Sequence, residues 1–134
     1  PPWASELSAA ISVARLHLDD LLRDHPSVAD APSLVAVAGT ATTVAAVELG
    51  MADYDRAVID EFTLSKAAAE DVSRTLATES LEDRVFNPGL LEARADVIVG
   101  GCCILVAVMR HLEFDECRIR DHDLLDGLAA ELLK

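Results

Sequence analysis

The sequence predicts an α/β domain that contains more helix than strand. Apolar residues recur at helical spacing over residues 3–24, which is typical of an amphipathic helix. A short aliphatic run at 33–38 is followed directly by glycine, a pattern that favours a buried parallel strand. An uncharged stretch at 97–109 indicates a buried helix. Hydrophobic residues make up 51% of the 134 residues and aromatic residues only 4%, so we expect an aliphatic core and a single domain at 1–134.

The first half of the chain is predicted to alternate between helix and strand. The helix at 3–24 ends before Pro26, which cannot continue it. The strand at 33–38 is followed by a helix at 41–49, and Gly50 stops that helix. This order of strand, glycine-containing turn and helix is one in which backbone amides can point at a ligand.

The second half is predicted to be mainly helical. In chain order, its elements are an extended segment at 58–64, a helix at 66–78, a helical turn at 81–86, a central helix at 90–112, a strand at 116–120 and a final helix at 123–133. Ser65 is a good cap for the first of these helices, and the Asn-Pro-Gly sequence at 87–89 breaks the chain before the central one. Because so few short strands do not form a stable open sheet alone, we expect further strands outside this chain.

The charge balance argues against several classes of partner. The formal net charge is −13, from 24 acidic and 11 basic side chains, so we expect neither nucleic acid nor an anionic membrane as a partner. The longest uncharged run, at 97–109, is shorter than the roughly 20 residues that a membrane-spanning helix needs. The three cysteines are odd in number and have no metal-ligand spacing, which indicates reduced thiols in a cytoplasmic protein.

The best candidate for a binding site is the sequence Gly39-Thr40-Ala41-Thr42-Thr43. Glycine lets the backbone approach a ligand closely, and free amides at a helix start attract an anion. The three hydroxyls can form hydrogen bonds with phosphate or ribose oxygens. The structural alternative is that the glycine only forms the turn while the threonines cap the helix.

Charged residues and glycines in the second half offer further possibilities. Arg94 could face a phosphate, which suits its guanidinium fork, or could pair with Asp96 at the head of the central helix. Three acidic residues surround His122, namely Asp121, Asp123 and Asp126. They could hold Mg²⁺ or could cap the final helix. The glycine pair at 100–101 indicates the close approach of another helix, since each glycine costs a helix roughly 1 kcal/mol relative to alanine.

Three segments, taken in order and at their spacings, resemble a known family. They are Leu34 to Thr43 with Tyr54-Asp55 behind it, Arg94 to Ile98 with Gly100-Gly101 and Ile104-Leu105, and Asp123 to Leu128. Each motif alone is weak. The set resembles the carboxy-terminal half of the Ppx/GppA phosphatase family, the exopolyphosphatases and guanosine-pentaphosphate phosphohydrolases, and the likeness extends over nearly the whole chain.

The resemblance implies a ribonuclease H-like lobe of the actin, sugar-kinase and heat-shock ATPase superfamily, here a helix-rich fragment with few strands. Two such lobes close on a cleft. In that family the Asp-x-Gly phosphate loops and the catalytic glutamate lie in the amino-terminal portion, and neither loop occurs in this sequence. The chain would therefore be a carboxy-terminal lobe that carries no catalytic residue and shows little phosphatase activity alone.

The resemblance also implies a function for a longer protein. That protein would hydrolyse the terminal phosphoanhydride of inorganic polyphosphate or of guanosine penta- and tetraphosphate, with Mg²⁺ offsetting the phosphate charge. This chain would line the cleft with its candidate ligand-binding residues, which are Gly39, Thr40, Thr42, Thr43 and Arg94. The implied protein is bacterial and cytoplasmic, binds a phosphate substrate rather than nucleic acid or a membrane, and could form a homodimer.

One departure from the family pattern leaves other functions open. Many members place a sequence that contains His-Gly where this chain has Asp60-Glu61-Phe62, and two acids there are expected to repel phosphate. Together with the net charge of −13, this allows a second function, a catalytically degenerate nucleotide- or phosphate-binding regulatory module. A third possibility is an association domain whose central helix lies at a subunit interface.

Overall fold

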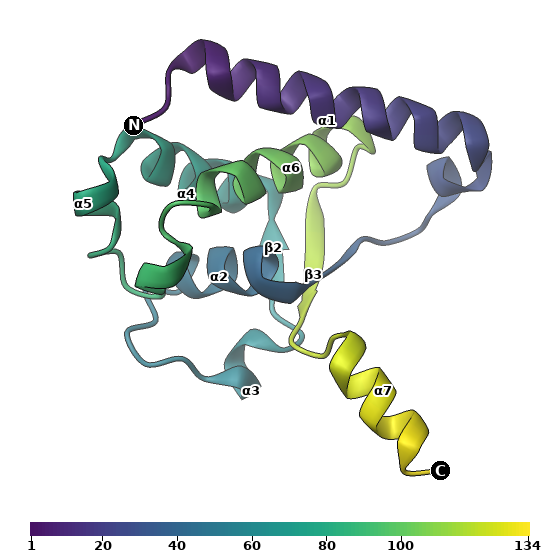
Figure 1. The fold of residues 1–134 in the computed structure, drawn as a ribbon. Coiled ribbons are helices and arrows are strands. Elements are labelled where there is room, and N and C mark those ends of the chain that lie inside the picture. The colour runs from purple at the N-terminus through teal and green to yellow at the C-terminus, as the bar shows by residue number, and fades with distance from the viewer.

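The structure contains one three-stranded sheet, whose strands come from distant parts of the chain (Figure 1). It is a computed structural model and describes residues 1–134. The strands are β1 (Val35–Val37), β2 (Thr63–Ser65) and β3 (Glu116–Arg120), and β3 lies between the other two. β1 is parallel to β3, with Val37 opposite Arg120, whereas β2 is antiparallel to β3. β1 is therefore an edge strand with no neighbour on its outer side.

Helices make up most of the remaining chain. They are α1 (Ala4–Asp24), α2 (Ala38–Glu48), α3 (Arg56–Ile59), α4 (Lys66–Thr78), α5 (Leu81–Arg84), α6 (Ile98–His111) and α7 (Leu124–Leu132), with 3-10 turns η1 (Pro26–Asp30) and η2 (Glu92–Arg94). α2 and α4 contact the sheet, and α6 packs against both of them. α1 lies along α6 at the top of Figure 1.

The sheet has one buried face and one open face. Leu64, Cys117 and Ile119 are at most 1% exposed and join a core cluster of 19 buried residues, most of them from α2, α4 and α6. Val35 and Val37 point to the open face and are about half exposed. The core therefore lies between the helices and the buried face of the sheet.

The prediction of a helix-rich α/β fold with few strands is confirmed. α1, α4 and β3 agree with their predicted bounds to within one residue. Ser65 caps α4 as expected, since its hydroxyl accepts a hydrogen bond of 3.0 Å from the amide of Ala68. The periodicity of apolar residues was sufficient for these elements because each turns a single apolar face toward its neighbours, and that face is buried in α4 and β3 and half-buried in α1.

The prediction of one central helix at 90–112 is wrong. α6 begins only at Ile98, and the preceding residues form an irregular segment that contains η2. We call residues 89–97 the strap. At the start of the strap, Gly89 has a φ of +93° and lies so close to α2 that a methyl group on it would be 2.5 Å from the carbonyl of Ala46. Contacts with α2 therefore override the helical pattern of the strap sequence.

Two other predicted boundaries differ from the structure. The segment at 58–64 is not extended throughout, because Asp55 accepts a hydrogen bond from the amide of Ala57 at 3.0 Å and begins the short helix α3. Only residues 63–65 form a strand. α2 begins at Ala38 rather than at residue 41, so no separate turn lies between β1 and α2.

The last helix, α7, projects away from the rest of the structure (Figure 1). None of its residues is buried, and its leucines are largely exposed, namely Leu124, Leu125, Leu128 and Leu132, as is Leu133 directly after it. Polar contacts at its first turn connect it to the body of the structure. No helix has both the length and the apolar character needed to cross a membrane.

Candidate functional site

The candidate site is centred on the junction between β1 and α2. The strand passes into the helix through Ala38, whose φ of +69° lies in the left-handed region that residues with a Cβ rarely adopt. No side chain caps the helix start at Val37, so the amides of the first turn remain available. The junction lies at the carboxyl end of a parallel strand pair, the edge at which open α/β sheets bind ligands.

The structure brings Gly39 and Arg94 into direct contact, although they are distant in the sequence. A methyl group on Gly39 would overlap the guanidinium group of Arg94, so only glycine permits this approach. The guanidinium takes part in no ion pair or side-chain hydrogen bond, and the pair with Asp96 that the sequence left open does not form. A half-buried cation without a carboxylate therefore lies beside the first turn of α2.

The three threonines of the candidate site have different environments. Thr40 packs against α6, where a methyl group on Gly101 would lie 2.7 Å from its Cγ2 atom. The Thr42 hydroxyl donates to the carbonyl of Ala38 at 3.2 Å. Thr43 is only 5% exposed and lies among the core residues. Thr43 is therefore largely enclosed by the core, and its part in ligand binding stays a prediction.

The close approach expected at the glycine pair 100–101 occurs at one of the two glycines. Gly101 contacts Thr40, whereas a methyl group on Gly100 would meet no atom within 4 Å. α2 thus makes close contacts that require a glycine near both of its ends. Near its start, Gly39 contacts Arg94 and Thr40 contacts Gly101, and near its end Ala46 contacts Gly89. These contacts fix α2 against α6 and the strap.

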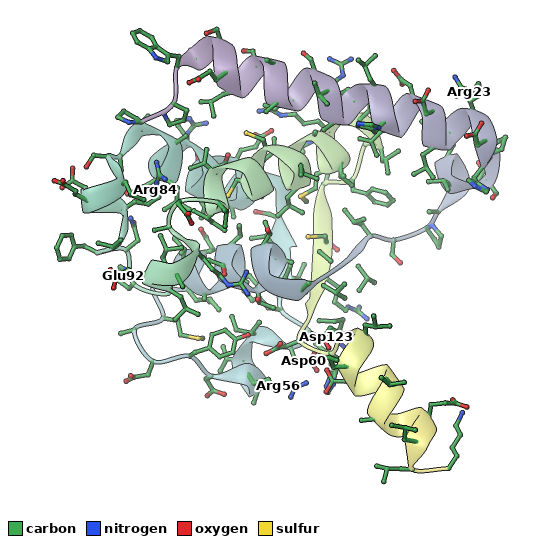
Figure 2. The ribbon with its side chains drawn as sticks, in the orientation of Figure 1. Arg23, Arg56, Asp60, Arg84, Glu92 and Asp123 are labelled. Carbon is green, nitrogen blue, oxygen red and sulfur yellow. The ribbon has the colours of Figure 1, made fainter.

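A polar network that the sequence did not reveal lies at the same edge of the sheet. Tyr54, in the loop after α2, donates a hydrogen bond of 2.6 Å to Asp121 at the end of β3. Burial, aided by this hydrogen bond, raises the pKa of Tyr54 to about 12. Arg56 of α3 donates to the carbonyl of Asp121 and, at 3.2 Å, to Asp126 of α7. Figure 2 shows Arg56, Asp60 and Asp123 gathered where α7 leaves the body.

Asp60 and Glu61 have a structural role in this network. Arg120 donates to Asp60 at 2.8 Å and to Glu61 at 3.3 Å, and Asp60 also accepts a hydrogen bond of 2.9 Å from the amide of Asp121. Arg120 carries one positive charge against the two negative charges, so the expected repulsion of a phosphate is reduced but stays a prediction. The signal that could have indicated this pairing is the arginine at the end of the predicted strand.

The acidic residues near α7 serve as caps and ion-pair partners. Asp123 caps α7 through the amide of Leu125 at 2.9 Å, and Asp126 accepts from the amide of Asp123 at 2.9 Å. No group of three or more histidine, cysteine, aspartate or glutamate side chains in the structure could hold a metal ion.

The network predicts a loss of stability in acid. Hydrogen bonds from backbone amides, with Arg120 and Arg56, lower the pKa of Asp60 and of Asp126 below the ordinary value of 3.8. A lowered pKa in the folded state contributes stability above pH 3.8, and this contribution disappears as the pH falls through the lowered pKa. Urea unfolding at a series of pH values measures this contribution. We expect Asp60→Asn to be less stable than the wild type at pH 6, and the two proteins to have equal free energies of unfolding at the most acidic pH.

Asp53→Asn is the matched control for this experiment, because it removes an exposed carboxylate that has no ion-pair partner. Its free energy of unfolding should equal that of the wild type at every pH. A difference between Asp60→Asn and the wild type that is independent of pH would contradict the electrostatic explanation.

Comparison with known proteins identifies relatives of this chain. No family model matches it. Over 136 aligned residues it is 32% identical to exopolyphosphatase 2 of Mycobacterium tuberculosis, an alignment that covers 98% of this chain and 42% of the relative. An exopolyphosphatase-like protein of known crystal structure superposes with a TM-score of 0.91 at 25% identity, covering 98% of this chain and 44% of that protein.

The fold is also found in the Ppx/GppA family member of Aquifex aeolicus, which superposes with a TM-score of 0.85 at 23% identity. That superposition covers 99% of this chain and 42% of the Aquifex protein. The chain thus spans less than half the length of each of these proteins. Both its sequence and its fold correspond to one part of those longer proteins.

Proposed function

This chain is related over nearly its whole length to the Ppx/GppA phosphatases, and from that premise we propose that it forms one wall of a phosphate-binding cleft in a longer hydrolase. The longer protein would hydrolyse the terminal phosphoanhydride of inorganic polyphosphate, or of guanosine penta- and tetraphosphate. Consistent with its motifs, the chain would be the carboxy-terminal lobe. The relatives named above support this proposal, because two of them are exopolyphosphatases or resemble one.

The contact between Arg94 and Gly39 is the observation that carries the proposal. An arginine side chain presents several donors in a planar fork that matches phosphate oxygens. The uncapped first turn of α2 adds backbone amides and the positive end of the helix dipole. Because no carboxylate pairs with Arg94, its charge is available for an anionic ligand. In this proposal Thr40, Thr42 and Thr43 lie at the margin of the site.

The role of the chain is to bind and orient the phosphate. The Arg94 guanidinium and the amide of Gly39 would hold the oxygens of a bound phosphate group and reduce the repulsion that an attacking water meets. A glutamate outside this chain would activate that water, as the family resemblance implies. Mg²⁺ is part of the proposal for the longer protein, where it would offset phosphate charge, and its protein ligands would come from outside this chain.

The net charge of −13 favours a second candidate function, a regulatory module that binds a nucleotide or phosphate without hydrolysing it. An excess of acidic groups weakens the binding of a polyanion. The two functions are distinguished in the full-length protein by measuring both phosphate release and binding, because the module would bind guanosine pentaphosphate or polyphosphate without releasing phosphate.

Replacement of Gly39 tests the proposed site. In the full-length protein, Gly39→Ala should raise KM for polyphosphate about ten-fold, because the new methyl group displaces the Arg94 guanidinium and a charge-assisted hydrogen bond is lost. Stability should change by less than about 1 kcal/mol, since the displaced group is the flexible end of a side chain and alanine favours helix.

Gly100→Ala is the control, because it makes the same chemical change in a helix where the added methyl group meets no atom. Its KM should equal that of the wild type. If KM is also unchanged in Gly39→Ala, then Arg94 and Gly39 do not bind the substrate.

A cytoplasmic location, a bacterial source and a homodimeric state are also part of the proposal. All three cysteines are buried and unpaired, and burial raises the pKa of Cys102 to about 12, so these thiols are poorly reactive. Such thiols are compatible with a reducing compartment. Light scattering on the full-length protein would test for the dimer.

A further inference from the structure

Arg84, at the end of α5, is a buried charged residue that the proposed site does not use directly. It is 5% exposed, and no acidic side chain pairs with it. Its guanidinium donates instead to backbone carbonyls, from Nε to Leu76 at 2.8 Å, from Nη1 to Ala95 at 2.7 Å and from Nη2 to Glu79 at 3.1 Å. Figure 2 shows Arg84 beside α5, on the side of the structure that carries the strap.

The carbonyls of Leu76 and Glu79 lie at the carboxyl end of α4. Carbonyls at this end of a helix have no partner within the helix and carry the negative end of its dipole. They therefore compensate part of the cost of burying the Arg84 charge. The third bond, to the Ala95 carbonyl, connects the end of α4 to the strap.

Ala95 directly follows Arg94 in the strap. It is 1% exposed, so its position is fixed by packing as well as by the bond from Arg84. At the other end of the strap, Gly89 is held against Ala46 of α2. The strap is thus attached at both ends, and the Arg94 side chain extends from it to Gly39.

From this geometry we propose that Arg84 is a positioning residue, which holds the strap so that Arg94 stays at the amino end of α2. This inference rests on the proposed function, because it gives Arg94 the task of binding phosphate. Arg84 itself is too deeply buried to touch a ligand and acts only through the Ala95 carbonyl.

The planar guanidinium is essential to this role. Arg84 donates in three directions at once, toward α4, the residue after α4 and the strap. A lysine ammonium keeps the charge but is a compact group on a flexible stem, which does not reproduce this fixed geometry. Arg84→Lys should therefore preserve the fold while it loosens the strap.

A double-mutant cycle in the full-length protein tests the proposal, with KM for polyphosphate of defined length as the readout. Arg94→Ala should raise KM about 10- to 100-fold, the effect of losing hydrogen bonds to a charged group. Arg84→Lys should raise KM about five-fold when Arg94 is present and less than about two-fold in the Arg94→Ala background. Arg74→Lys is the matched control, since Arg74 is exposed on α4 and pairs only with Asp71. It should leave KM unchanged.

Hydrogen exchange gives a second readout, which does not depend on catalysis. The strap amides, at 94–97, should exchange faster in Arg84→Lys than in the wild type or in Arg74→Lys. If Arg84→Lys does not fold, Asn87→Ala takes its place in the cycle. Asn87 donates to the Arg84 carbonyl at 2.9 Å and to the Glu79 carboxylate at 2.5 Å, so its removal loosens the backbone from which Arg84 reaches the strap.

The outcomes separate this inference from the proposed function. If Arg94→Ala leaves KM unchanged, both the proposed site and the role of Arg84 are wrong. A second outcome is that Arg94→Ala raises KM, while Arg84→Lys either leaves KM unchanged or raises it equally with and without Arg94. The proposed site is then supported, and Arg84 has only a structural role. Unchanged exchange of the strap amides would also overturn the proposed role of Arg84.

Discussion

Gly89→Ala should destabilise the protein by about 4 kcal/mol, the largest effect that we expect from a single substitution here. Two costs add at this position. The φ of +93° disfavours any residue with a Cβ, which contributes about 1–2 kcal/mol. The new methyl group would also lie 2.5 Å from the backbone of Ala46, and a helix backbone cannot move aside as a side chain can. Urea unfolding followed by circular dichroism measures the sum.

Gly50→Ala separates the two costs. Gly50 also has a positive φ, of +59°, but a methyl group on it would meet no atom within 4 Å. We expect this control to lose only the conformational part, about 1 kcal/mol. Equal losses in the two variants would mean that the strap does not press against α2 as closely as the structure indicates.

Gly101→Val should destabilise the protein by about 3 kcal/mol, because it forces extra volume into a packed contact. The Cβ atom alone would lie 2.7 Å from Cγ2 of Thr40 and 3.1 Å from its Cβ atom. Thr40 is branched at Cβ and has few alternative rotamers in a helix, so α2 and α6 must separate to make room. Urea unfolding again provides the measurement.

The neighbouring glycine provides the control for this substitution. Gly100→Val makes the same change one residue earlier in α6, at an exposed position without neighbours, and should alter stability by less than about 0.5 kcal/mol. Thr40→Ala should restore part of the stability lost in Gly101→Val, because it removes the atoms in conflict. If Gly100→Val and Gly101→Val have the same effect, helix propensity rather than the contact between α2 and α6 explains the loss.

Local patterns in the sequence were sufficient to predict the elements that turn one regular apolar face toward the rest of the structure. The periodicity of α1 and α4 and the alternation in β3 are visible in single segments, and the Ser65 cap is adjacent to the helix that it serves. The strap could not be predicted in this way. Its apolar residues have helical spacing, but contacts with a helix that lies 43 positions earlier in the chain decide its path, as the pair Gly89 and Ala46 shows.

The candidate site was only partly predictable, because its residues meet through contacts between distant parts of the chain. Gly39 and Arg94 could be singled out from residue type, yet nothing local indicates that they touch. The contacts of Tyr54 and Asp60 with the segment around Asp121 are formed between residues more than 60 positions apart. Arg84 gave no signal at all, because its partners are backbone carbonyls, which every residue carries.

The direct passage from β1 into α2 links two parts of the molecule mechanically. Since no loop separates Val37 from Ala38, a displacement of β1 is transmitted directly to the first amides of α2. A strand that pairs with the open side of β1 would therefore hold these amides in place. Completing the sheet and preorganising the proposed anion-binding turn would then be thermodynamically coupled, so that a longer polypeptide would gain affinity from sheet assembly.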